Sequence, residues 1–115
     1  MKYAANMSVA GKPKLYDVEL VSSDPSPPAR GNDTWAFKVV DANGQPVSGA
    51  TISVTPYMPD HRHGTQVVPT VTAQPDGSFT ATPLYLFMPG LWTITLDVKA
   101  ATGEDSVEYA FCVEG

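Results

Sequence analysis

Residues 91–100 read LWTITLDVKA, and this stretch decides the fold class. Apolar and polar residues alternate along it, so the side chains of Trp92, Ile94, Leu96 and Val98 share one face of an extended chain. Such period-two alternation is typical of a half-buried β-strand, because successive side chains of a strand point to opposite faces of its sheet. We therefore predict a strand here, with its apolar face in the core.

Six other segments of the chain are rich in strand-forming residues, and turn residues such as Asn43-Gly44 and Asp76-Gly77 separate them. They are residues 14–22, 34–41, 50–57, 66–73, 78–86 and 107–113. Seven short strands around a core tryptophan are typical of an all-β, seven-stranded immunoglobulin-like β-sandwich. We expect residues 14–115 to form this single domain and residues 1–13 to be a flexible N-terminal segment.

Composition excludes several classes of protein. The chain has 115 residues, of which 43% are hydrophobic and 17% charged, so it has the composition of one globular domain. Its formal net charge of −5 argues against a nucleic-acid partner, which requires a basic patch. No apolar run approaches the roughly 18 residues of a membrane-spanning helix, so we expect no direct membrane insertion. The first residues contain no signal-like apolar core, which leaves a cytoplasmic chain or a processed mature chain.

Both histidines of the protein lie in YMPDHRHGTQ, residues 57–66, as His61 and His63, close after Met58. A second methionine, Met88, lies in LFMPGLW, directly before the strand at residues 91–100. The third and sixth strands of an immunoglobulin-like sandwich are antiparallel neighbours, so the end of one lies beside the start of the other. The predicted fold therefore brings Met58, His61, His63 and Met88 to one end of the molecule.

The chemistry of these four side chains favours copper. Imidazole is a borderline ligand and thioether a soft one, and together they suit Cu(I) better than Zn(II) or the hard ions. His61 and His63 are two residues apart, which in extended backbone places both rings on one side and Arg62 on the other. Gly64 would let the chain bend away from whatever the rings hold. We predict a metal site of Met58, His61, His63 and Met88, with Cu(I) favoured.

Simpler interpretations remain open at this point. A His-x-His loop can be merely solvated, and methionines often fill gaps in a core. The single cysteine, Cys112, excludes an intrachain disulfide, and its parity places it opposite Phe111. A Cys112 thiolate near the site could join the ligands, but we favour a small buried hydrophobe. A blue-copper site would need a His and a Met just after the cysteine, where only VEG follows. We expect no enzyme, because no nucleophile lies in a recognisable elbow, although Asp60 could orient His61.

Two segments together resemble a known family. DANGQPVSGATISVTPYMPDHRHGT (41–65) and PDGSFTATPLYLFMPGLWTITLDV (75–98) are similar to the YtkA-like domain, which is related to FixH proteins. The resemblance extends from about Asn32 to Val113, and the loop together with MPGLW is its most specific part. Members often have glycine between the two histidines, where this chain has Arg62, but both ring positions are intact.

The resemblance implies a periplasmic or otherwise extracytoplasmic domain, often membrane-anchored, that handles copper. It implies metal ligands at Met58, His61, His63 and Met88, and a core role for Trp92 beneath the loop. We expect a copper-binding protein for Cu(I) storage or for transfer as a copper chaperone, with a copper-accepting or copper-donating protein as its partner. The alternatives are a structural or adhesive immunoglobulin-like interaction module without tight metal binding, and a module that binds a small molecule.

Overall fold

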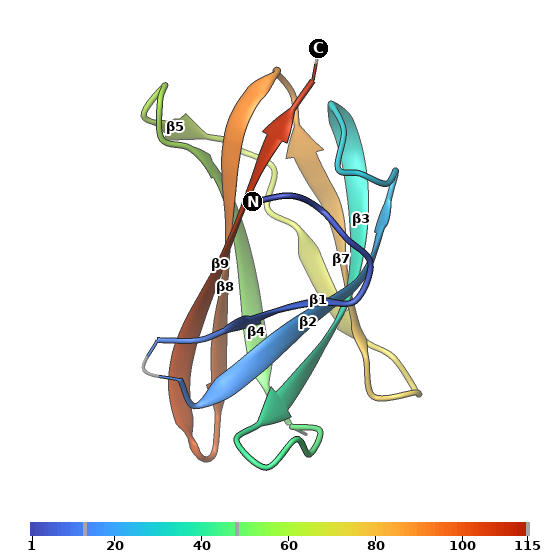
Figure 1. Cartoon of the computed structure of the whole chain (residues 1–115), viewed down its shortest axis with the longest axis vertical. Helices are drawn as coiled ribbons and strands as arrows, with labels where there is room; N and C mark the ends of the chain where they lie inside the picture. Colours follow the sequence, from blue (N-terminus) through green and yellow to red (C-terminus); the bar gives the residue numbers. More distant parts are fainter. Residues whose placement is uncertain (13, 48, 115) are drawn as a thin grey trace.

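The computed structural model describes residues 1–12, 14–47 and 49–114, and in these residues the chain forms two antiparallel β-sheets and no helix. Strand order is β1-β2-β3-β7-β6 in the five-stranded sheet and β5-β4-β8-β9 in the four-stranded sheet (Figure 1). The strands are β1 (Met7–Ala10), β2 (Tyr16–Asp24), β3 (Gly31–Asp41), β4 (Thr51–Met58), β5 (His63–Gly64), β6 (Thr70–Ala73), β7 (Phe79–Leu86), β8 (Gly90–Ala100) and β9 (Gly103–Val113). In the described part of the chain, no helix has the length and apolarity needed to cross a bilayer.

Each of the seven predicted strands is present, but the described residues contain nine strands, so the predicted count is wrong. The additional strands are β1, which pairs with β2 at a sheet edge, and β5, which pairs with the end of β4. β1 lies inside residues 1–13, which were expected to be a flexible segment, and its half-buried Met7 and Val9 cover the core. Residues 13 and 115, at the bounds of the predicted segment and domain, lie outside the described residues.

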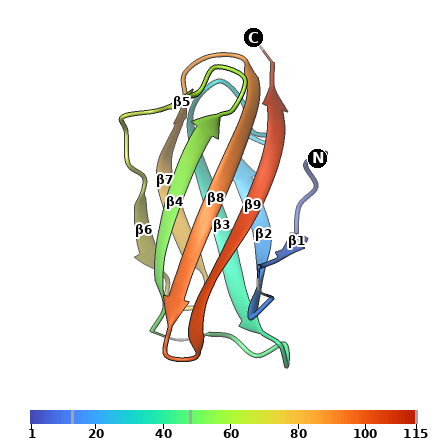
Figure 2. The same ribbon diagram turned by 90° about the vertical axis from the view of Figure 1, so that its left-hand side faces the viewer.

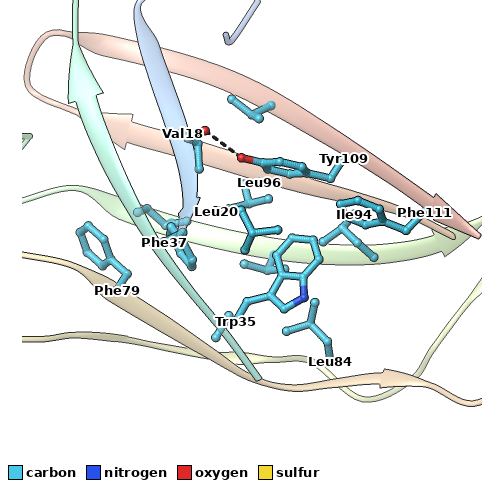
Figure 3. Close-up of a cluster of buried hydrophobic side chains, with 14 of the residues drawn as sticks. Val18, Leu20, Trp35, Phe37, Phe79, Leu84, Ile94, Leu96, Tyr109 and Phe111 are labelled. Carbon is cyan, nitrogen blue, oxygen red and sulfur yellow. Dashed lines mark hydrogen bonds between the residues drawn. The ribbon is translucent and has the colours of Figure 1, made fainter. Parts of the chain in front are cut away.

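The core lies between the two sheets. On the inner face of β8, the predicted apolar row is buried, and its members are no more than 1% exposed: Trp92, Ile94, Leu96 and Val98. Trp35 of β3 faces this row from the other sheet and contacts Tyr109 of β9 edge to face, with ring centroids 5.5 Å apart (Figure 3). Alternation along each strand thus directs one set of side chains into a shared aromatic and aliphatic core.

Two polar side chains buried near this core, those of Tyr109 and Asp105, form hydrogen bonds across the sandwich. The Tyr109 hydroxyl donates to the Val18 carbonyl oxygen at 2.7 Å (Figure 3), and burial raises the pKa of this phenol. Asp105 is 5% exposed, and its carboxylate accepts the backbone N–H groups of Leu15 and Tyr16 at 2.7 and 3.0 Å. These bonds attach the start of β2 to β9, in the opposite sheet.

Candidate metal centre

The topology that the sequence predicts for the two motif segments is confirmed. β4 is antiparallel to β8, with Tyr57 opposite Thr93, so β4 ends beside the place where β8 begins. Met58 is the last residue of β4, and Met88 lies in the turn between β7 and β8. Figures 1 and 2 show β5 and the β7–β8 turn at the same end of the sandwich.

The histidine loop is a tight hairpin, and the expected extended backbone across its two histidines is wrong. β4 and β5 are antiparallel, with Met58 opposite His63, and the backbone N–H of His61 donates to the Met58 carbonyl at 3.2 Å. Arg62 adopts a left-handed φ of 55°, which reverses the chain between the strands. The hairpin nevertheless places the rings of His61 and His63 side by side, with centroids 5.6 Å apart.

His63 is the most constrained of the predicted nitrogen ligands. It is half-buried, and because it lies directly opposite Met58, the two side chains extend from the same face of the sheet. Its Nδ1 lies 3.2 Å from the Gly64 carbonyl oxygen. A carbonyl oxygen only accepts hydrogen bonds, so this contact favours the tautomer with the proton on Nδ1, in which Nε2 carries the lone pair that can bind a metal.

The two methionines differ in exposure. Met58 is fully buried, whereas Met88 is half-buried and packs against the core. Trp92, which the sequence assigns to the core beneath the loop, is fully buried, and its Nε1 donates to the Met88 carbonyl at 2.9 Å. The indole thus fixes the main chain of the residue whose thioether is a predicted ligand. His61, in the hairpin turn, is exposed to solvent.

Gly64 was predicted to let the chain bend away from the histidine rings, but the structure gives it a different role. A Cβ at this position would lie 2.7 Å from the carbonyl oxygen of Pro56, a backbone atom that cannot move aside. Glycine is therefore required because β5 approaches β4 closely, which is the approach that aligns His63 with Met58.

The four predicted residues suit a soft metal ion in chemistry, and the two histidines suit one in spacing. Metal–imidazole bonds are about 2.0–2.1 Å long, so the centroids of two rings on one ion lie roughly 5–6 Å apart, and the observed 5.6 Å agrees with this spacing. Among the described residues, no group of three or more His, Cys, Asp or Glu side chains is placed to hold a metal.

Cys112 is exposed, so the expectation that it is a small buried hydrophobe is wrong. Its neighbours Phe111 and Val113 are buried, which places the Cys112 thiol on the outer face of the sheet. The Met58 thioether lies on the inner face. The parity argument from the sequence therefore predicted the position of this thiol better than the general preference of cysteine for burial.

Two residues near this end were missed by the sequence analysis. Phe87, directly before Met88, stacks on His63 with ring centroids 5.7 Å apart. Asp33 is 1% exposed, and its Oδ2 accepts the Ala29 N–H at 3.1 Å, while Oδ1 has no hydrogen-bond partner among the described residues. Burial, aided by the negative charge of Asp24, raises the pKa of Asp33 to about 7 against the opposing effect of the Ala29 bond. Two sequence signals could have identified these residues. Asp33 is an aspartate on the inward face of a strand, and Phe87 is an aromatic residue directly before MPG.

Comparison with known proteins supports both the fold and the family. The sequence model of the YtkA-like family matches residues 11–97. A solved structure of a copper-bound variant of FetP, from a uropathogenic strain of Escherichia coli, is similar over 100% of this chain and 94% of that chain, with a TM-score of 0.62. The two sequences are 13% identical, so this likeness shows a shared fold. No curated protein sequence gives a significant match.

Proposed function

The chain belongs to the YtkA-like family, and on this premise we propose that it binds one copper ion, preferentially Cu(I), through Met58, His61, His63 and Met88. Its role is to store the ion or to pass it to another protein, without catalysis. The fold supports an assignment to the immunoglobulin-like sandwiches, with the metal centre at one end.

The observation that carries the proposal is the pairing of Met58 with His63 at the end of β4, beside the turn that contains Met88. Two segments 30 residues apart in the sequence each contribute a thioether to this end, and the first of them also contains both histidines of the chain. The free Nε2 of His63 and the 5.6 Å spacing of the two imidazoles support a shared ion.

Ligand type favours Cu(I). Thioethers bind soft Cu(I), whereas zinc sites use thiolate, imidazole and carboxylate ligands, and calcium and magnesium require oxygen. The copper-bound state of the FetP structure, which has the same fold, adds support for copper as the metal. A set of two thioethers and two imidazoles is neutral, so it would hold Cu(I) as a singly charged centre.

The gradient of exposure across the site suits transfer of the ion. Met58 is buried and His61 is exposed in the hairpin turn. A partner protein could therefore replace the exposed imidazole first and the buried thioether last, which would exchange the ligands of the ion one at a time. The partner would be a copper-accepting or copper-donating protein, and we place this exchange outside the cytoplasm, on a chain held near a membrane.

Competition between metals tests the proposal. The protein should be incubated without oxygen with equal amounts of Cu(I) and Zn(II), dialysed, and its metal content measured by mass spectrometry. The Cys112→Ser variant should be used throughout, because an exposed thiol can itself bind Cu(I). The proposal predicts one copper per chain and little zinc. A preference for zinc would contradict it.

A further inference from the structure

Phe87 connects the two segments that form the candidate metal centre, the histidine hairpin and the turn that contains Met88. Its ring stacks on the imidazole of His63, with centroids 5.7 Å apart and planes 21° from parallel. On another side it meets the indole of Trp92 edge to face, at 5.6 Å and 79°. Phe87 also immediately precedes Met88, so it is adjacent in sequence to one predicted ligand and in contact with another.

Trp92 packs against the ring of Phe87, and two hydrogen bonds fix the backbone of this turn. Trp92 is fully buried, and its bond to the Met88 carbonyl fixes the backbone just after Phe87. The side chain of Arg30 donates from Nε to the Phe87 carbonyl at 3.1 Å, which attaches this turn to the segment before β3. The phenyl ring is therefore fixed in position, and the His63 imidazole stacks on it.

His63 needs such a surface because its own backbone gives it little support. It belongs to a strand of two residues that pairs on one side with the end of β4. A side chain of this kind loses rotamer freedom when it binds an ion, and that loss of entropy weakens binding unless the ring is ordered beforehand. Stacking on Phe87, together with the Nδ1 contact to Gly64, orders the imidazole in the free protein.

We propose that Phe87 is a positioning residue of the metal centre, and that its ring holds the His63 imidazole in the orientation that leaves Nε2 free for the ion. The inference rests on the copper-binding role proposed above. Stacking would also strengthen when the ion is bound, because a metal-bound imidazole carries positive charge and the face of a phenyl ring attracts cations.

Tyr85 provides a matched control. Its ring contacts Phe87 at 5.7 Å, but it is 38% exposed and belongs to the outer face of β7. If only general packing around Phe87 mattered, loss of the Tyr85 ring would disturb the site as well. If the stack on His63 matters, Tyr85→Leu should leave the site unchanged.

The test uses the variants Phe87→Leu, Phe87→Tyr and Tyr85→Leu in the Cys112→Ser background, with two readouts. The first is the NMR shift of the His63 ring protons in the copper-free protein, which the current of a stacked phenyl ring displaces. The second is the affinity for Cu(I) against a competing chelator. Phe87→Leu should abolish the displacement and weaken Cu(I) binding on the order of 10- to 100-fold, as loss of groups that orient metal ligands does. Phe87→Tyr should retain both the displacement and the affinity, and Tyr85→Leu should change neither.

Wild-type values of both readouts in Phe87→Leu would overturn the inference, and so would unchanged affinity alongside a lost ring-current shift. Thermal unfolding reports whether each variant folds, and Phe87→Ile replaces Phe87→Leu if the latter does not. If the wild-type chain takes up no Cu(I), the proposed function fails. The shift of the His63 protons in the copper-free protein still decides separately whether Phe87 orders this ring.

Discussion

The terminal methyl of Met58 lies against Gly90: a Cβ placed on Gly90 would stand 2.8 Å from Met58 Cε. This contact joins the two motif segments, because Met58 precedes the histidine hairpin and Gly90 follows Met88. Gly90 also has a φ of +133°, which side-chain-bearing residues rarely adopt. Glycine in MPGLW is therefore required both by its backbone conformation and by the volume of the predicted ligand Met58.

Gly90→Ala should destabilise the protein by about 1–3 kcal/mol, since it adds backbone strain to a clash with a fully buried side chain. The free energy of unfolding in urea measures this effect. In a Met58→Ala background the clash is absent, so the same substitution should cost less.

Gly31→Ala is the control for strain alone. Gly31 has a φ of +110°, but a Cβ there would meet nothing within 4 Å. Gly90→Ala could lower the free energy of unfolding no more than Gly31→Ala does, and by the same amount with and without Met58. In that case the contact between Met58 and Gly90 does not contribute to stability.

Replacing Met58 and Met88 together by leucine should weaken Cu(I) binding by roughly tenfold or more, while Cu(II) binding changes little, because thioethers prefer the soft ion. Leucine conserves volume, so each substitution should cost less than about 1.5 kcal/mol of stability. Parallel titrations with Cu(I) and Cu(II) provide the measurement. An unchanged affinity for Cu(I) would show that the thioethers are not ligands, and equal losses for the two ions would contradict a site that prefers Cu(I).

The sequence predicted the convergence of the two segments, but not how they meet. Period-two alternation located β4 and β8, and their antiparallel pairing follows from the fold class. β5 has only two residues and therefore no period to detect. Its position depends on the left-handed conformation of Arg62. Glycine is the usual sequence signal of that conformation, and this position has arginine instead.

Side-chain contacts were harder to predict from the sequence than the strands were. The stack of Phe87 on His63 depends on how a turn presents its ring, and turns lack the alternation that assigns strand residues to a face. β1 went unnoticed because it has only four residues, of which two are half-buried and two exposed, and it pairs at the edge of a sheet. By contrast, strict alternation in β9 correctly placed Cys112 on the face opposite Phe111.

Protonation of Asp33 should make stability depend on pH. Its pKa in the folded state is about 7, above the ordinary value of 3.8, so the folded chain binds a proton more tightly than the unfolded chain. The free energy of unfolding should therefore rise as pH falls from about 7 to about 4, and level off outside this window. Urea unfolding across pH 4–8 measures the slope.

Asp33→Asn should remove this slope and stabilise the protein above pH 7, because the amide is neutral and its oxygen can still accept the Ala29 N–H. A variant with the same dependence on pH as the wild type would assign the effect to other groups.

Asp105→Ala should destabilise the protein by about 1–3 kcal/mol for each buried donor that it leaves unpaired, and the Tyr16 N–H is fully buried. Asp97→Ala, on the exposed face of β8, should change stability by no more than about 0.5 kcal/mol. Thermal or urea unfolding of the two variants makes the comparison. Similar values for both would mean that the Asp105 carboxylate does not hold β2 to β9.

The most direct measurement of the central claim is an oxygen-free titration of the Cys112→Ser protein with Cu(I) against a chromophoric chelator. The protein should withdraw one Cu(I) per chain from the chelator, and replacing His61 and His63 by alanine should abolish this withdrawal while the variant still folds. Failure of the folded Cys112→Ser protein to compete at any chelator concentration would contradict the account.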